Sequence, residues 1–214
     1  MFALPTPRAA SRTALAAVAA VAAAMPAAAA PVDHTAAQVA RGVCSGQTRS
    51  TDEVGAALTR AQALKAWNAF IHLDEAGAKA AASKLDAAHR TARCRPLAGV
   101  PIVVKDNIEV AGLPSSAGTP ALAGYVPAAD APVVARLRAA GAIVIGKTNM
   151  HELAFGVTGW NPMSQTGSEP GVRNAWDRSR IAGGSSSGTG TAVGARVVPA
   201  GLGTDTGGSV RIPC

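Results

Sequence analysis

The residues best placed to do chemistry lie in two glycine- and serine-rich segments, GGSSSGTG at 183–190 and GTDTGGSVRIP at 203–213. Glycines directly before a serine let the backbone approach a ligand and can aim successive N–H groups at a developing negative charge. Ser209, in TGGS, therefore has the setting of a nucleophile with its own oxyanion hole. Flexible surface turns are the simpler interpretation, but the repeated density of hydroxyls and glycines favours the catalytic one.

A serine nucleophile needs a base, and no histidine follows these segments, so no Asp–His relay can be assembled. His72 and His89 have no acidic or cysteine partner at ligand spacing, and we expect them to be surface or packing residues. Lysine is the available candidate.

Lys105 ends an apolar strand predicted over 100–104. Two interpretations of this lysine stay open. Its ammonium could reach water along its aliphatic stem, or it could be a buried amine whose pKa is lowered by desolvation, so that it can act as a base. Asp106 follows directly, and alternation along a strand would aim it at the opposite face.

The stretch GAIVIGKT at 141–148 fits the phosphate-loop pattern of nucleotide-binding proteins. Its four middle residues are a continuous apolar run, which is typical of a buried strand whose N–H groups are committed to the sheet. The preceding segment has Asp130 as a predicted N-cap, Pro132 in the first turn and Gly141 just past the end of a helix. A buried helix–strand unit is therefore predicted, and a nucleotide site is not.

The composition favours a soluble α/β enzyme. The chain has 214 residues, of which 48% are hydrophobic, enough to bury a core. The net charge of +7 comes from scattered basic residues without interleaved aromatics, so we expect no nucleic-acid partner. There is no C-x-x-C motif or Cys/His cluster, and we expect neither a metal nor a cofactor.

The first 30 residues have the order of a signal peptide: Arg8 and Arg12, an apolar run, then small residues at 28–30. The apolar run is too short for a membrane span, so we expect no stable membrane insertion. An Ala-rich tail or lipid-facing anchor is the alternative. A signal peptide implies export from a bacterial cytoplasm to a periplasm.

An oxidising compartment permits Cys44 and Cys94 to form a disulfide. Two free buried thiols are the alternative, and sequence alone does not decide between them. Cys214 is the last residue.

Several elements are predicted to position these residues. Ser50 and Glu53 have the spacing of a capping box at the start of a helix. A second, Ala-rich helix is expected from about Asp74 to His89. Between the two serine-rich segments, a short helix and then a buried strand are expected.

The three motifs GVPIVVKDN, GGSSSGTG and GLGTDTGGSVRIP, in this order, resemble the amidase signature family, which hydrolyses carboxylic amides with a Ser, cis-Ser, Lys triad. The resemblance runs from about Thr51 to the last residue. It implies an α/β fold with a mixed central sheet flanked by helices, of which this chain would hold the N-terminal portion. The expected organisation is a signal peptide over 1–30 and a truncated amidase domain over 31–214.

By this resemblance, Ser209 is the nucleophile, Ser185 the bridging serine on a cis peptide, and Lys105 the base. The oxyanion hole would be formed by the N–H groups of Thr206, Gly207, Gly208 and Ser209. The substrate would be a small-molecule amide, and the oligomeric state stays open. The chain departs from the family pattern at Ala182 and Ser187, where proline and glycine are usual, and in ending RIPC instead of RIPA.

Within the family, the chain looks most similar to bacterial amidases labelled indoleacetamide hydrolase. An exported peptide amidase is one alternative. A protein similar to the A subunit of glutamyl-tRNA amidotransferase is another, although that protein works in the cytosol. A non-catalytic fragment that kept the glycine loops is the third.

Overall fold

A computed structural model describes residues 34–88, 94–167 and 171–214. The predicted signal peptide, residues 1–30, and His89 lie outside them. The α-helices are α1 (Ala36–Ser45), α2 (Ser50–Ala63), α3 (Glu75–Ala88), α4 (Pro132–Ala139) and α5 (Ser187–Gly194). The strands are β1 (Phe70–Leu73), β2 (Pro101–Lys105), β3 (Ile143–Thr148) and β4 (Ala200–Leu202), and short 3-10 turns span Lys65–Trp67, Pro120–Leu122 and Glu152–Ala154. None of the helices in these ranges is long and apolar enough to cross a membrane.

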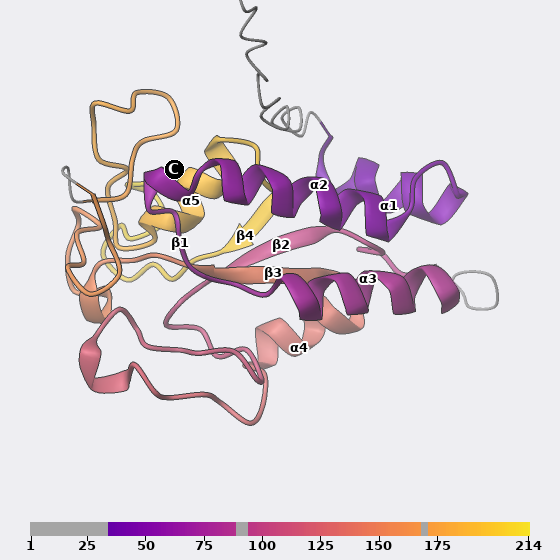
Figure 1. The fold of residues 1–214 in the computed structure, drawn as a ribbon, viewed down its shortest axis with the longest axis horizontal. Coiled ribbons are helices and arrows are strands. Elements are labelled where there is room, and N and C mark those ends of the chain that lie inside the picture. Colours follow the sequence, from indigo (N-terminus) through magenta and orange to yellow (C-terminus); the bar gives the residue numbers. More distant parts are fainter. Residues whose placement is uncertain (1–33, 89–93, 168–170) are drawn as a thin grey trace, which may run out of the picture.

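The four strands form one mixed sheet in the order β1-β3-β2-β4. Strand β2 pairs in parallel with both β3 and β4, while β1 pairs antiparallel with β3. The predicted mixed sheet flanked by helices is therefore confirmed (Figure 1). Because β2 and β3 are parallel and in register at Lys105 and Thr148, the loops that follow both strands start at the same end of the sheet, on the left in Figure 1.

Each face of the sheet packs on its own set of helices. One buried cluster joins α2, α3 and α5 to Val103, Ile143 and Ile145. The other joins α1 and α4 to Ile102, Val104 and Val144. Side chains along β2 thus alternate between the two clusters, as the pleat of a strand requires. Lys105 follows Val103 onto the α5 face.

A bulge changes this alternation in β3. The register with β2 shifts between the pairs Ile102↔Val144 and Val103↔Gly146, so β3 holds one extra residue at that point. As a result Lys147 pairs with Val104 and lies on the α1/α4 face, opposite to Lys105. A Cβ on Gly146 would collide with the carbonyl oxygen of His72 in β1. This glycine therefore serves strand packing, and the rejection of a phosphate loop agrees with the fold.

Two helix starts differ from their predictions. Helix α2 begins at Ser50, but its N-cap is Arg49 and no side chain caps it. The Ser50 amide instead donates to Asp86 Oδ1 in α3 at 2.7 Å, which supplies the acceptor that a capping box would have provided. Likewise Ala131, not Asp130, is the N-cap of α4, because the Asp130 carboxylate accepts from the Ala111 amide at 2.8 Å.

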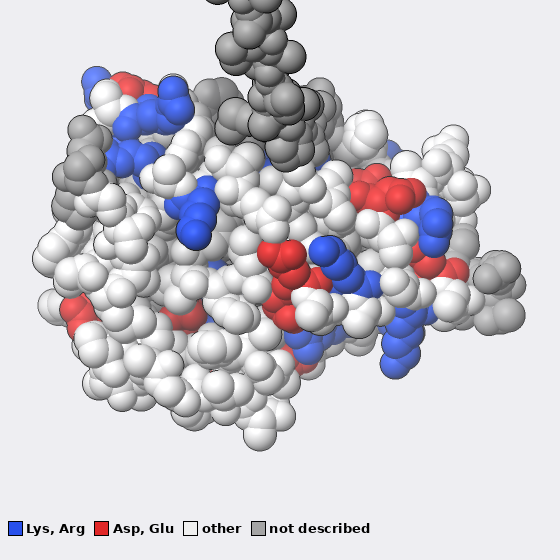
Figure 2. Space-filling view, in the orientation of Figure 1, with Lys and Arg blue, Asp and Glu red and all other residues white. Residues whose placement is uncertain are grey.

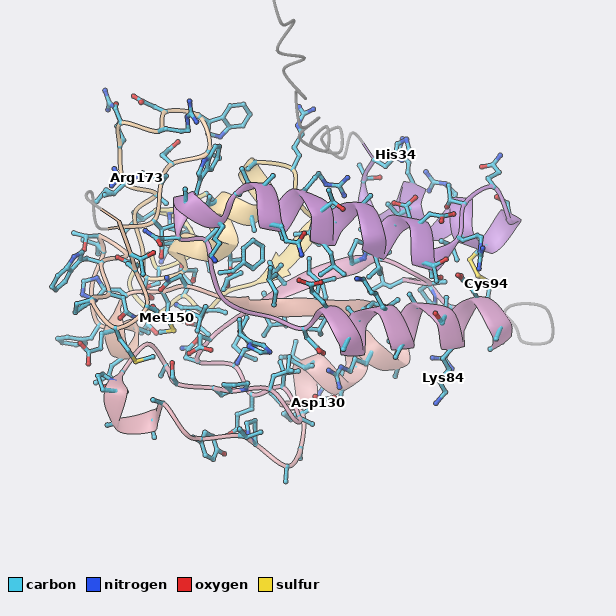
Figure 3. All side chains as sticks on the ribbon, viewed as in Figure 1. His34, Lys84, Cys94, Asp130, Met150 and Arg173 are labelled. Atoms are coloured by element: carbon cyan, nitrogen blue, oxygen red, sulfur yellow. A yellow bond between two sulfur atoms is a disulfide. The ribbon has the colours of Figure 1, made fainter. Side chains whose placement is uncertain are left out.

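Cys44 and Cys94 form a disulfide, with Cα atoms 5.7 Å apart, so the alternative of two free thiols is wrong. Figure 3 shows the bridge near the label of Cys94. It fastens the end of α1 to the segment that leads into β2. Cys214 is free and exposed.

Charged side chains on the face drawn in Figure 2 lie in separate groups, several of which combine basic and acidic residues. Exposed ion pairs join Lys79 to Glu75 and Arg180 to Asp177. In the part of the chain that the structure describes, no group of three or more His, Cys, Asp and Glu residues could hold a metal ion.

Candidate active site

Lys105 lies at the end of β2 with a fully buried side chain. Its Nζ is 2.6 Å from Ser185 Oγ, 2.8 Å from Thr204 Oγ1 and 3.4 Å from the Thr204 carbonyl oxygen. Burial lowers its pKa to about 8, although the charge of Asp205 acts in the opposite direction. The lysine is therefore a desolvated amine and does not extend to water. The raising effect of Asp205 was missing from the sequence interpretation.

Ser185 is fully buried at the start of the segment that leads into α5. The peptide bond between Gly184 and Ser185 is cis, as the family resemblance implied. The Ser185 carbonyl accepts a hydrogen bond from the His151 amide at 3.1 Å. A Cβ on Gly184 would collide with the backbone of Gly159, so the close approach of these two loops requires glycine there.

Ser209 lies in the neighbouring loop and is partly exposed. Its carbonyl accepts from the Ser186 amide at 3.0 Å, which joins the two serine-rich segments. No hydrogen bond of the Ser209 hydroxyl occurs within the described residues. The structure thus brings Lys105 and Ser185 into contact and places Ser209 in the adjoining loop, without a hydrogen bond between the two serine hydroxyls.

The four predicted oxyanion-hole amides do not behave alike. The Gly208 amide donates to Asp205 Oδ1 at 2.7 Å, so in this structure it is not free to bind an oxyanion. A carboxylate is a strong acceptor, and it also receives the amides of Val210 and Arg211. Within the described chain, the amides of Thr206, Gly207 and Ser209 have no acceptor. Three of the four predicted donors are therefore available.

Asp205 acts as a clamp on the loop that carries Ser209. Besides three amides of this loop, it accepts from Arg211 Nη2 at 2.9 Å and Nε at 3.1 Å. The Arg211 side chain is the main cause that holds the pKa of Asp205 well below its usual range. The sequence interpretation did not single out Asp205, although its place four residues before Ser209 in GTDTGGS could have indicated it.

Ser186 and Thr204 were also missed. The Ser186 hydroxyl donates to the Thr204 carbonyl at 3.2 Å and accepts from the Thr204 amide at 3.3 Å. Asn107 Nδ2 lies 3.2 Å from Thr204 Oγ1. These contacts hold Thr204 against Lys105. The signal for Ser186 was present in the sequence as the second of three consecutive serines.

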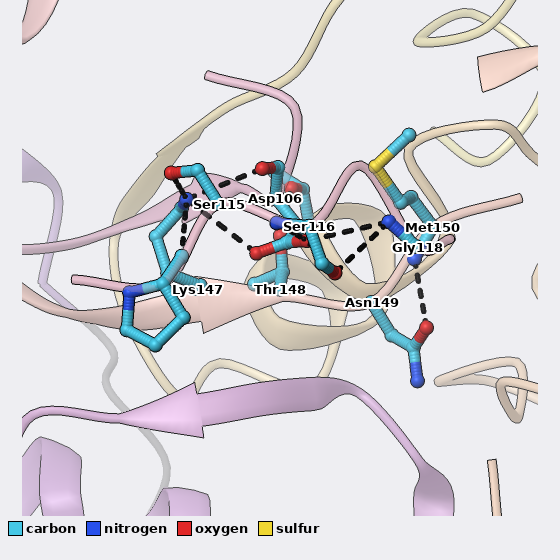
Figure 4. Close-up of polar contacts among 10 residues, drawn as sticks. Asp106, Ser115, Ser116, Gly118, Lys147, Thr148, Asn149 and Met150 are labelled. Atoms are coloured by element: carbon cyan, nitrogen blue, oxygen red, sulfur yellow. Dashed lines mark hydrogen bonds and ion pairs between the residues drawn. The ribbon is translucent and has the colours of Figure 1, made fainter. Parts of the chain in front are cut away.

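Asp106 faces away from this site, as alternation along β2 predicted. Its Oδ1 lies 3.4 Å from Nζ of Lys147, and both side chains are fully buried (Figure 4). Its Oδ2 accepts from the amide and hydroxyl of Ser116. Burial lowers the pKa of Lys147, and the contact with Asp106 opposes that shift. The side chains of the two buried lysines, Lys105 and Lys147, therefore lie on opposite faces of the sheet.

Proteins of known function are similar to this chain in sequence. A mandelamide hydrolase of Pseudomonas putida is 55% identical over 167 residues, which cover 73% of this chain and 33% of the relative. The A subunit of glutamyl-tRNA(Gln) amidotransferase from Deinococcus radiodurans is 42% identical over 180 residues, covering 84% of this chain and 36% of the relative. The chain thus spans about a third of the length of these curated relatives.

Solved structures agree with the sequence comparison. The crystal structure of an amidase superimposes with a TM-score of 0.76 at 44% identity, covering 84% of this chain and 40% of that one. A peptide amidase from Stenotrophomonas maltophilia gives a TM-score of 0.78 at 36% identity, covering 85% and 38%. The family model described as Amidase matches residues 52–214. The chain therefore belongs to the amidase signature family.

Proposed function

We propose that this chain carries the catalytic residues of an amidase that hydrolyses a carboxylic amide through a serine acyl-enzyme. Ser209 is the nucleophile, Ser185 the bridging serine and Lys105 the base. The observation that carries the proposal is the 2.6 Å contact between Lys105 Nζ and Ser185 Oγ in a buried setting beside the Ser209 loop. A buried lysine with a depressed pKa and no touching carboxylate has the properties of a base.

In the proposed reaction, neutral Lys105 takes the proton of Ser185, and Ser185 takes that of Ser209. The Ser209 oxygen then attacks the amide carbonyl carbon, and the amides of Thr206, Gly207 and Ser209 stabilise the oxyanion. When the carbon–nitrogen bond breaks, the proton returns through Ser185 to the leaving nitrogen, and ammonia or an amine departs. Water, deprotonated along the same path, attacks the acyl ester and releases the acid.

The similarity to mandelamide hydrolase supports a small aromatic amide as the first substrate to test. The similarity to peptide amidase keeps an exported peptide amidase as the second candidate. Relatives named as amidotransferase subunits share the motifs, but an exported protein would be separated from cytosolic partner subunits. A non-catalytic fragment remains the alternative from another class.

A serine-reactive fluorophosphonate separates a catalytic protein from a scaffold. In the full-length protein we expect labelling at Ser209, found by mass spectrometry of peptides, and loss of labelling in Ser209→Ala. Turnover of an amide substrate should fall on the order of 10⁴-fold or more, because a catalytic unit fails when its nucleophile is removed. Ser179→Ala, in an exposed turn, is the matched control. Near-wild-type turnover in Ser209→Ala would contradict the proposal.

We further propose export to a bacterial periplasm, with residues 1–30 as the signal peptide. The disulfide between Cys44 and Cys94 supports an oxidising compartment. Amino-terminal sequencing of the protein from the periplasmic fraction should begin shortly after residue 30. A periplasmic protein that still begins at Met1 would rule out a cleaved signal peptide.

A further inference from the structure

The amine of Lys105 has three neighbours, and Thr204 supplies two of them. These are Thr204 Oγ1 at 2.8 Å and the Thr204 carbonyl oxygen at 3.4 Å, beside Ser185 Oγ at 2.6 Å. A charged ammonium can donate one N–H to each neighbour. A neutral amine has only two N–H groups and one lone pair, and a base must direct that lone pair at the proton it takes.

The Thr204 carbonyl can only accept, so one N–H of neutral Lys105 must point at it. The second N–H goes either to Thr204 Oγ1 or to Ser185 Oγ, and the lone pair takes the remaining position. Only the first arrangement aims the lone pair at Ser185. The direction of the Lys105 lone pair therefore depends on whether the Thr204 hydroxyl or the Ser185 hydroxyl accepts the second N–H.

Burial decides between the two arrangements. Ser185 is fully buried, and Lys105 is the one partner of its hydroxyl in the described chain. If Ser185 accepted from Lys105, its own proton would have no acceptor there, which is costly in a buried site. Thr204 is partly exposed, so its hydroxyl proton can reach water. The favoured state has Thr204 accepting and Ser185 donating to the lysine.

We propose that Thr204 is a positioning residue that occupies both N–H groups of neutral Lys105 and so directs its lone pair at Ser185. Two residues hold Thr204 in place for this task, through three hydrogen bonds. The Ser186 hydroxyl bonds to its backbone amide and carbonyl, and Asn107 Nδ2 donates to its Oγ1. The inference rests on the proposed function, in which Lys105 is the base.

Charged groups around Lys105 also affect its pKa, so they must stay the same when Thr204 is changed. Asp205, in the loop after β4, raises the pKa of Lys105 by its charge and is itself paired with Arg211. Asp106 and Lys147 pair with each other on the opposite face of the sheet. A substitution at Thr204 leaves all four groups unchanged, so a shifted titration would report the lost hydroxyl.

The test compares Thr204→Val with Thr204→Ser in the full-length protein. Valine removes the hydroxyl and keeps the carbonyl, while serine keeps both. In Thr204→Val, the plateau rate of fluorophosphonate labelling at high pH should fall about tenfold or more, because the base is misdirected. The apparent pKa should fall by about one unit, because the ammonium loses an acceptor. Thr204→Ser should restore both values.

A second measurement does not depend on reactivity. The ¹³C resonance of the Lys105 Cε, assigned with Lys105→Ala, reports the lysine pKa directly. If the wild-type protein is not labelled at Ser209, the proposed function fails. The resonance then still shows whether the Thr204 hydroxyl accepts a hydrogen bond from the Lys105 ammonium. An unchanged Lys105 pKa in Thr204→Val, or an unchanged labelling plateau in a reactive protein, overturns the inference. Far-ultraviolet circular dichroism of both variants checks that the fold is kept.

Discussion

At the scale of single residues, the two buried lysines of the sheet differ in the groups that contact their amines. Lys147 lies against the Asp106 carboxylate, Ser115 Oγ and two backbone carbonyls. Among the residues that the structure describes, Lys105 contacts two hydroxyls and one carbonyl, and Asp205 acts on it through its charge without a hydrogen bond. Desolvation disfavours both ammonium groups, but only Lys147 has an anion in contact to compensate. Lys105 is the one suited to lose its proton.

This contrast predicts the pH dependence of the reaction. A lysine with a pKa of about 8 is charged below that pH and neutral above it, and only the neutral form is a base. The labelling rate of Ser209, or kcat/KM for a simple aryl amide, should therefore rise with pH through about 8 and then level off. Lys105→Ala should remove the rise and most of the rate.

The matched control is Lys84→Ala, in the exposed surface of α3, which should keep the wild-type profile. A Lys105→Ala protein with the same pH profile as wild type would show that another group is the base. The assignment of Ser185 as the bridging serine would then lose its support as well.

At the scale of elements, the sequence predicted helices and strands well where the apolar pattern was long. Strand β2, helix α3 and the helix–strand unit of α4 and β3 lie where they were expected. Strand β1 was missed, because its four residues are all half-buried and show no alternation. The capping box at Ser50 was wrong, because an acceptor from another helix, Asp86, replaced the local one.

The candidate site was predictable from sequence where its residues stand in local motifs, and not where its geometry depends on contacts between distant segments. Motifs identified Lys105, Ser185 and Ser209 as candidates, since each stands in a distinctive local pattern. The β3 bulge that turns Lys147 away from Lys105, and the capture of the Gly208 amide by Asp205, depend on contacts between segments. A single sequence carries no direct signal for either.

The buried ion pair of Lys147 and Asp106 joins β3 to the end of β2 and to the loop at 114–118, so we expect its loss to destabilise the fold. Lys147→Met would leave the Asp106 carboxylate buried without its cation. We expect the free energy of unfolding, from urea denaturation, to fall by about 3–5 kcal/mol. Lys79→Met, which breaks the exposed pair with Glu75, should cost less than about 0.5 kcal/mol.

Lys147→Met combined with Asp106→Asn should recover part of the lost stability, because no uncompensated charge remains and the amide oxygen can still accept from Ser116. Equal stability losses for Lys147→Met and Lys79→Met would mean that the buried pair contributes no more than a surface pair. The pair would then not stabilise the ends of β2 and β3.

At the scale of the whole molecule, the two faces of the sheet carry separate buried clusters, and the disulfide joins parts of the chain around one of them. Cys44 is in α1, whose Val39 and Ala40 pack in the same cluster as Ile102 and Val104 of β2. Cys94 leads into β2, which ends at Lys105. The bridge thus fastens a helix of the α1/α4 layer to the strand that presents the proposed base.

The disulfide should therefore stabilise the whole described fold. Its cysteines are 50 residues apart, and closing a loop of that length reduces the entropy of the unfolded chain, an effect of about 2–4 kcal/mol in most proteins. We expect Cys44→Ser to lower the free energy of unfolding by that amount in urea denaturation, and Cys214→Ser, at the exposed free cysteine, to leave it unchanged. Alkylation of the protein purified without reductant, followed by mass spectrometry, should modify Cys214 and leave Cys44 and Cys94 unmodified. Modification of Cys44 and Cys94 without a reductant would show that the bridge does not form in the purified protein. Equal stability of the two serine variants would show that the bridge does not support the fold.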